Sequence, residues 1–533
     1  MKKSHTLSRL IALLLAVMMM FALTACGSKQ EAPKPAEEGS ATAESETDAE
    51  PAEKVLKIGE LWAITSLSLG TTTKEKILVT ETLVNVDPNF KLVPALATDW
   101  ENVDDLHWVF NLRDDVTFHD GSKMDADAVV WAIMSDIEKN PTLVTNNKIE
   151  KAEATGEYQV TITTSVPNAE LPEYMEQAGM SIVTPDSYDA EGNMVLPIGT
   201  GPFKMESFDV STGVVTIVRN DDYYGDKPSL DKVTLTGMTD ANTRANALES
   251  GEIDFTCDLP FNQIERLDAL DNVRVELYDT ARVYAAKLNC NGFFGDKLVR
   301  QAVSLAIDRE TISSKVLFGA GTPAKNIYTP NMAWCDTNID ASTFDLEKAK
   351  DLMAQAGWAD SDGDGILDKD GQPFTFTIIT YTERPGLPLI AEALQAQLKE
   401  LGMDVKVSTM ENSAINDEMA KGEWGMYLAG LATAQAPSSV WFMNNNYNEK
   451  SLSDIGYSNP KFTELLDKCT ATFDTEGRYA ISKEIQALAM EELPMIYICN
   501  YGCAYGFNEK VQNFVFNPTA HDYMWNTDIE IVD

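Results

Sequence analysis

Three aspartates at alternate positions are the residues in this sequence that most clearly indicate chemistry. Asp360, Asp362 and Asp364 lie in a short Asp/Gly segment, and the carbonyl of Ile366 and the side chain of Asp368 follow. A calcium loop presents carboxylates at its first, third and fifth positions, a glycine at the sixth and a backbone carbonyl at the seventh. The spacing therefore predicts a structural calcium site formed by these five residues.

The same segment also has a simpler interpretation. Gly371 stands where a calcium-binding helix–loop–helix motif carries a bidentate glutamate, and the segment lies between a predicted helix and a predicted strand. A plain Asp/Gly turn therefore remains the alternative. No other cofactor is expected, and a bound calcium ion would brace this loop without taking part in a reaction.

The thiol of Cys26 is the second candidate. A basic start with Lys2, Lys3 and Arg9 precedes an apolar run over residues 10–23, and small residues come just before the cysteine. The run is shorter than the roughly 20 apolar residues that a spanning helix needs. This order resembles the lipobox of bacterial lipoproteins, which implies lipid on Cys26 and a tether to the outer face of a membrane. The alternative is an ordinary signal peptide with an incidental cysteine.

The residues after Cys26 predict a spacer. Residues 27–54 are rich in Pro and Glu and hold no aromatic side chain, so they bury too little apolar surface to offset their ordering entropy. We expect a signal segment over 1–26, a disordered acidic linker over 27–54, and a secreted body after it. The body holds no apolar run of membrane-spanning length.

Charge and composition exclude several classes of function. The formal net charge is -41, which argues against nucleic-acid partners because these require basic surfaces. The six cysteines after Cys26 show no disulfide framework, and we expect them to be buried small hydrophobes. The sequence lacks a Gly-x-Ser-x-Gly elbow, a His-Glu-x-x-His pair and a phosphate loop, so we expect that the protein is not an enzyme. His119, a lone histidine beside a turn, is expected to be a structural hydrogen bonder.

Hydrophobic periodicity predicts the elements that must position these residues. Helical stripes over residues 344–356 and 389–401 each end at a glycine, and strand patterns occupy 374–380 and the region of 405–407. Strand–helix–strand order at this spacing predicts an α/β lobe. A further helix is expected after Asp125, a good N-cap residue.

An ordered set of short blocks resembles a known family. The blocks are Val93–Trp100, Trp108–Val116, Phe118–Gly121, Asp125–Val129, Gly199–Phe203, Asn220–Gly225, Leu248–Asp254, Val299–Val303, Ala306–Arg309 and Ala349–Trp358. Together they are similar to family 5 of the extracellular solute-binding proteins, the peptide- and nickel-binding class that serves ABC importers. The resemblance covers nearly the whole chain after the linker.

The resemblance implies an α/β fold with two lobes that close like a clamp, of the type II periplasmic-binding-protein kind. Lobe I would comprise residues 55–288 and 500–533, with an inserted subdomain near 84–198, and lobe II residues 289–499. Two crossing strands would allow the hinge closure that removes a solute from water. The implied function is capture of a small solute by a monomer and delivery to an ABC permease. A nickel- or other metal-chelate binder, and a sensing receptor without transport, are the alternatives.

The predicted cleft departs from both ligand classes of the family. Peptide binders commonly carry an Asp opposite the peptide ammonium, but the corresponding loop 430–441 has Pro437 and no acid. Nickel-chelate binders commonly place an Arg in a lobe I segment that here, over 177–181, holds none. Because a buried ammonium without a carboxylate is costly, ordinary free-amine peptides are expected to bind weakly.

Candidate ligand-binding residues are therefore chosen by position and chemistry. They are aromatic or polar side chains expected near the cleft, where a small amphipathic solute would bind. In lobe I they are Trp62, Thr71, Thr72 and Tyr284. In lobe II loops they are Tyr381, Arg384, Gln435 and Trp441, of which Arg384 would pair with a carboxylate. For Arg384 an exposed, solvated charge is the alternative.

Overall fold

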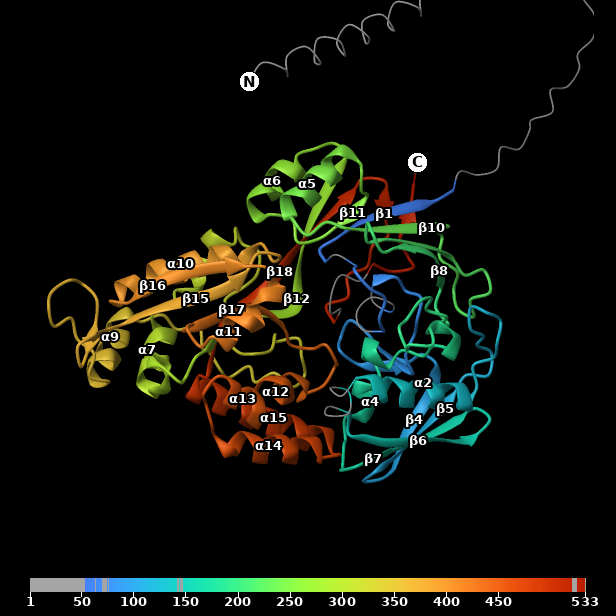
Figure 1. Ribbon diagram of the computed structural model, residues 1–533, viewed down its shortest axis with the longest axis horizontal. Helices are drawn as coiled ribbons and strands as arrows, with labels where there is room; N and C mark the ends of the chain where they lie inside the picture. Colours follow the sequence, from blue (N-terminus) through green and yellow to red (C-terminus); the bar gives the residue numbers. More distant parts are fainter. Residues whose placement is uncertain are drawn as a thin grey trace, which may run out of the picture. The chain divides into compact units, whose positions relative to one another are not determined.

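The computed structural model describes residues 53–62, 64–69, 74, 76–140, 143, 147–519 and 525–532 (Figure 1). Residues from Glu53 onward form one compact unit. The predicted signal segment with Cys26 and nearly all of the predicted linker lie outside the described residues, as do Thr71 and Thr72. None of the described helices combines the length and apolar character needed to cross a membrane.

A ten-stranded sheet joins residues from most of the chain, in the order β16-β15-β17-β12-β18-β11-β1-β10-β9-β8. Its strands are β1 (Val55–Glu60), β8 (Phe203–Asp209), β9 (Val214–Arg219), β10 (Lys232–Gly237), β11 (Phe255–Thr256), β12 (Val273–Leu288), β15 (Thr375–Tyr381), β16 (Asp404–Met410), β17 (Met426–Ala432) and β18 (Met495–Asn508). The strands predicted over 374–380 and from 405 are thereby confirmed as β15 and β16, which pair in parallel.

The antiparallel strands β12 and β18 lie at the centre of this sheet (Figure 1). Residues 273–279 of β12 pair with 502–508 of β18, which also pairs with β11 of lobe I. Beyond a register shift between Asp279 and Val283, β12 pairs with β17 of lobe II. β12 thus gains β17 as a second neighbour a few residues before the crossover predicted near 288, and β18 pairs with β11 a few residues after the crossover predicted near 499. The exact lobe boundaries remain a prediction.

The region predicted as an inserted subdomain has its own sheet and core. Its four strands are β4 (Ala97–Asp104), β5 (His107–Leu112), β6 (Ile149–Gly156) and β7 (Gln159–Thr164), in the order β4-β5-β7-β6. The helix α2 (Ala126–Lys139) covers it, and the Asp125 carboxylate accepts from the Ala128 N–H, as the N-cap prediction required. Shorter elements here are β2 (Val84–Val86), β3 (Leu92–Pro94) and α4 (Leu171–Tyr174).

Helices surround the second half of the sheet. They are α7 (Lys297–Leu305), α8 (Arg309–Thr311), α9 (Leu346–Gln355), α10 (Gly386–Glu400), α11 (Ile415–Ala420), α12 (Trp441–Asn446), α13 (Glu449–Asp454), α14 (Pro460–Thr470) and α15 (Thr475–Glu492). The two stripes predicted as helices are confirmed as α9 and α10. The glycines after them, Gly357 and Gly402, have φ of 84° and 87°, the left-handed conformation typical of a helix end.

The remaining elements are short. Two helices, α5 (Ala241–Ser250) and α6 (Ile264–Asp268), precede β12. The pairs β13 (Asp368–Lys369) with β14 (Gln372–Pro373), and β19 (Val511–Gln512) with β20 (Glu530–Ile531), form two-stranded sheets.

Two predictions about single residues are confirmed. The His119 ring contacts the Gly201 carbonyl, Nε2 to O 3.0 Å, and burial lowers its pKa to about 4, as suits a structural histidine. All six cysteines from Cys257 onward are buried and free. Gly201 is required by packing, because a Cβ there would lie 2.4 Å from the Leu78 carbonyl oxygen.

Candidate functional site

Side chains from the two predicted lobes meet at two places. We name the first, built from Trp62, Asp258, Tyr284, Arg384 and Tyr501, the inner contact. The second, the outer contact, is built from Glu170 and Glu173 of lobe I and from Ser438, Ser439 and Arg478 of lobe II.

An ion pair forms the centre of the inner contact. Arg384 Nη1 lies 3.2 Å from Asp258 Oδ2, and the two side chains are 3% and 0% exposed. The other carboxylate oxygen accepts a hydrogen bond from the Tyr501 hydroxyl at 2.5 Å. The guanidinium carbon lies 5.2 Å from the centre of the Tyr501 ring and 5.9 Å from that of Trp62. Arg384 is therefore not the exposed charge of the alternative hypothesis, and it pairs with a carboxylate of the protein itself.

Local sequence explains how Arg384 comes to lie here. Gly386 opens α10, and a Cβ at this position would lie 2.4 Å from the Tyr284 hydroxyl, so only glycine permits this approach. The Tyr284 ring packs on Tyr501 with centroids 4.6 Å apart. On the other side, Asp258 adopts φ of 48°, a left-handed conformation that Asp tolerates better than most residues. Both partners are held by backbone features and not by the ion pair alone.

The outer contact is centred on Glu170, which is 1% exposed. Its carboxylate accepts hydrogen bonds from the Ser438 hydroxyl, and from the N–H and hydroxyl of Ser439 at 3.0 and 2.5 Å. Arg478 Nε lies 3.0 Å from Glu170 Oε1. These partners precede α12 or belong to α15, so a single carboxylate joins the inserted subdomain to two helices of lobe II.

A second carboxyl in the outer contact has a different charge state. Glu173 Oε1 lies 3.6 Å from Arg478 Nη2. Burial and the neighbouring charge of Glu170 raise the pKa of Glu173 to about 8. At neutral pH Glu173 is therefore mostly protonated.

The other predicted cleft residues lie on the lobe II side. Tyr381 is the last residue of β15 and Trp441 the first of α12, so neither lies in a loop as predicted. The Tyr381 hydroxyl accepts from the Gly430 N–H at 3.2 Å. The Trp441 indole N–H is buried and has no hydrogen-bond partner among the described residues. Gln435 is half-buried. The structure thus places an unpaired donor, Trp441, two residues after the outer contact.

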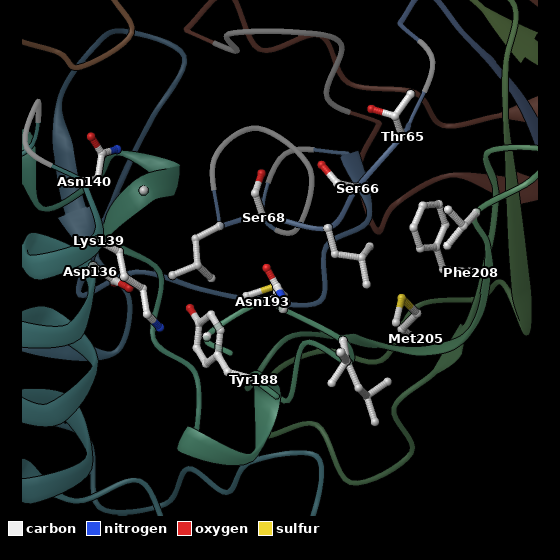
Figure 2. A pocket seen from close by; sticks show the side chains of 18 of the residues that line it. Thr65, Ser66, Ser68, Asp136, Lys139, Asn140, Tyr188, Asn193, Met205 and Phe208 are labelled. Atoms are coloured by element: carbon white, nitrogen blue, oxygen red, sulfur yellow. The ribbon is translucent and has the colours of Figure 1, made fainter. Parts of the chain in front are cut away.

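Two cavities are lined by residues of both predicted lobes. One of about 560 Å³ lies between lobe I residues 239–242 and 260–262 and lobe II residues that include Glu383. A second, of about 360 Å³, lies between residues 279–281 of β12 and residues 329–331. Volumes of this order suit a small solute. A third cavity, of about 940 Å³, is lined by lobe I residues alone (Figure 2).

The Asp loop forms a cluster separate from both contacts. Carboxylate oxygens of Asp360, Asp362 and Asp364 lie within 4.8 Å of one another. The Asp368 carboxylate instead accepts from the Ser361 N–H and hydroxyl, and the Ile366 N–H donates to Asp364 at 2.8 Å. Three of the five predicted ligands are thus brought together.

Sequence reasoning missed Asp258, Glu170 and Arg478. One signal was available for Asp258, since a lone acid in the apolar run from Cys257 to Leu259 needs a partner once it is buried. Its partner lies 126 residues away, and Ser438 lies 268 residues from Glu170. No local pattern in a single sequence connects such pairs.

Comparison with known proteins places this geometry in context. Residues 91–454 match the family described as bacterial extracellular solute-binding proteins, family 5. The oligopeptide-binding protein AppA of Bacillus subtilis is 28% identical over 462 residues, which cover 83% of this chain and 84% of AppA. The nickel-binding periplasmic protein of Escherichia coli is 27% identical over 455 residues, which cover 79% of this chain and 84% of that protein.

Solved structures agree with the fold. NikA from Staphylococcus aureus in complex with Ni(L-His)2 superposes with a TM-score of 0.79 at 24% identity, over 90% of this chain and 100% of NikA. AppA from Bacillus subtilis in complex with a nonapeptide gives a TM-score of 0.77, also at 24% identity, over the same shares of the two chains. The mixed α/β fold with two lobes is therefore confirmed.

Proposed function

The chain belongs to family 5 of the bacterial extracellular solute-binding proteins, and on this basis we propose that it captures a small peptide or peptide-like solute between its lobes and delivers it to the permease of an ABC importer. The protein would act as a monomer and carry out no reaction on the solute. The observation that carries this proposal is the lobe junction, where the inner and outer contacts join residues of both lobes around aromatic and polar side chains.

The chemistry of the junction supports a solute with few exposed charges. Arg384 already pairs with Asp258, so binding a solute carboxylate there would require an existing buried ion pair to be broken. The loop from Gln435 to Pro437 carries no acid, and the serines after it are held by Glu170. The unpaired indole N–H of Trp441 suits a neutral acceptor such as a peptide carbonyl.

Calorimetry with matched peptides tests this proposal. We expect a tripeptide with an acetylated N-terminus and an amidated C-terminus to bind at least about tenfold more tightly than the same tripeptide with free ends, because the free ends would lose hydration without gaining partners. Mass spectrometry of solutes released from the purified, denatured protein identifies the natural ligand class. Submicromolar binding of the free tripeptide would contradict the proposed solute class.

A metal chelate is the second candidate, favoured by the similarity to the nickel-binding protein of Escherichia coli. Titration with nickel and histidine together forms a separate arm of the same experiment. Tight binding of the chelate with no binding of either peptide would replace the peptide proposal. The gene neighbourhood tests the third candidate: permease and ATPase genes beside this one would favour import, and their absence would favour a sensing receptor.

We also propose that lipid on Cys26 anchors the protein to the membrane. The support is the basic, apolar and small-residue order before Cys26. Cys26→Ala is expected to move most of the protein from the membrane fraction to the soluble fraction, because a protein without the acyl chains loses its anchor. Immunoblotting of the two fractions measures this. Ser28→Ala, a neighbouring change, should leave the distribution unaltered, and an unchanged Cys26→Ala distribution would contradict lipidation.

A structural calcium ion at the Asp loop is a further proposal. The three clustered carboxylates fit the hard oxygen ligands that calcium prefers. Calcium at about 100 times its Kd should stabilise the folded protein by about 2.7 kcal/mol, seen as a rise in Tm. The double change Asp362→Ala with Asp364→Ala should abolish this rise, whereas Asp351→Ala, at an exposed position of helix α9, should retain it. Absence of any rise in the unmutated protein would support the plain turn.

A further inference from the structure

The cavity of about 940 Å³ in lobe I is distinct from the lobe junction (Figure 2). It lies between the loop 65–69, the end of helix α2, the segment 192–196 and the edge strand β8. Its volume lies within the range of small-molecule sites. Since its lining contains no lobe II residue, an occupant of this cavity would be bound by lobe I alone.

Apolar side chains form about half of the cavity wall and gather at its rim. Leu67 and Leu69 are buried within it, and Met205 and Phe208 line it from β8. Of the ten exposed large apolar side chains among the described residues, three rim this cavity, namely Val195, Leu196 and Val210. Because exposed apolar side chains are otherwise scattered, their gathering here indicates a surface that binds an apolar group.

Asp136 is the buried polar group of the cavity. It is 4% exposed, and its Oδ2 has no hydrogen-bond partner among the described residues. Burial raises the pKa of Asp136 to about 8, so the carboxyl is mostly protonated at neutral pH and can donate a hydrogen bond. A buried carboxyl without a partner is costly, and a ligand group that accepts its proton in a hydrogen bond would remove this cost.

Lys139 supplies a positive charge one turn further along α2. Its Nζ lies 3.1 Å from the centre of the Tyr188 ring and 5.9 Å from that of Trp131, and no acidic side chain pairs with it among the described residues. Figure 2 shows Asp136, Lys139 and Tyr188 together at one end of the cavity.

We propose that this cavity binds a small amphipathic carboxylate. Its anionic group would lie between the Lys139 ammonium and the Asp136 hydroxyl, and its apolar body would pack on the leucines and on Met205 and Phe208. The charges that face Asp136 are consistent with an anion. Lys139 is positive and Tyr188 is neutral, because burial raises its pKa above the usual range. Glu206, on the β8 wall, is half-exposed and lies 3.3 Å from Lys232.

The protonation of Asp136 can be tested without any ligand. The pKa of Asp136 is raised from 3.8 to about 8 on folding, so protonation of this carboxyl stabilises the folded protein. This contribution to stability is fully present below pH 4 and is lost as the pH rises through 8. Asp136→Asn does not titrate, and we expect it to raise Tm by a few degrees at pH 9 and to leave Tm nearly unchanged at pH 4. Scanning calorimetry at the two pH values measures the difference. An equal shift at both would contradict the raised pKa.

Calorimetry with sodium octanoate tests the binding site itself, on the whole mature chain. We expect octanoate to bind and octylammonium, which has the same apolar chain and the opposite charge, to bind at least about tenfold more weakly. Lys139→Met should weaken octanoate binding by at least about tenfold, and Lys123→Met, an exposed lysine just before α2, should leave it unchanged.

A second variant fills the cavity without touching its charges. Ser207 is exposed on the edge strand β8 and lines the cavity, so Ser207→Phe should block octanoate binding while the protein still folds. The melting temperature of each variant shows whether it folds. Octanoate that fails to bind at millimolar concentration, or binds equally well to the Lys139→Met or the Ser207→Phe protein, would overturn the proposal.

The pH dependence of octanoate affinity shows whether the octanoate carboxylate is bound by Asp136 together with Lys139 or by Lys139 alone. Because a protonated Asp136 is required, octanoate affinity should fall about tenfold from pH 7 to pH 9. In Asp136→Asn, whose amide still donates a hydrogen bond, the affinity should not change over this range. An equal fall in both proteins would overturn the role of Asp136.

Discussion

Replacing Arg384 by alanine is expected to lower the free energy of unfolding by about 3–5 kcal/mol, because it removes a guanidinium that forms an ion pair with a buried carboxylate. Asp258 is fully buried, and Arg384 Nη1 is 3.2 Å from it. The Tyr501 hydroxyl still donates to Asp258 in the variant, which favours the lower end of this range. Urea unfolding followed by circular dichroism, at constant m-value, measures the loss.

A double variant provides the control for this prediction. Arg384→Met together with Asp258→Asn removes both charges while retaining much of the side-chain volume, so most of the stability should return. A double-mutant cycle then gives the coupling energy of the pair. If the single and the double variants lose equal stability, the loss comes from packing of the arginine stem and not from an unpaired charge.

Replacing Glu170 by alanine is expected to weaken solute binding by about 100-fold, since it removes the charge that joins the inserted subdomain to lobe II. The change leaves Arg478 and two serine hydroxyls without their main partner. A loss of about 3 kcal/mol from the closed state corresponds to two powers of ten in affinity, provided that only the closed state holds the solute. Calorimetry measures the affinity, and small-angle X-ray scattering measures the opening.

Glu173 offers a matched control for Glu170. It faces the same arginine at 3.6 Å, but it is mostly protonated at neutral pH because of its burial and its acidic neighbour. Glu173→Gln should therefore change affinity much less than Glu170→Ala does at pH 7. An equal effect of both changes would show that the outer contact depends on shape and not on the charge of Glu170.

Much of the fold could be predicted because its signals are local. The leucine stripe of α10 is formed by residues within one or two helical turns of one another, and the alternation of β15 by residues a few positions apart. The glycines that end α9 and α10 are equally local, since they need only the left-handed conformation at one position. The predictions agree with the structure because the apolar faces of α10 and β15 are the faces that are buried in the core.

The site could be predicted only in part, because its chemistry depends on distant pairs. Arg384 was predicted to bind a solute carboxylate, which stays a prediction; in the structure it pairs with Asp258, 126 residues before it. The local sequence does not indicate the partners of the Glu170 carboxylate, since its four side-chain contacts are with residues beyond 437. Local sequence specifies which side chains are unusual, and tertiary folding decides their partners.

The central pairing of β12 with β18 has a consequence for how the protein is made. Lobe I includes β11, whose neighbour β18 is synthesised more than two hundred residues later, and the Trp525 indole donates to the Lys76 carbonyl across 449 residues. Contacts of such high sequence separation slow folding, because long loops must close before they form. Lobe I therefore stays incomplete until lobe II has been synthesised, and its unfinished sheet edge is open to aggregation during that interval. A nascent chain that stops before residue 495 would lack the strand that completes both lobes.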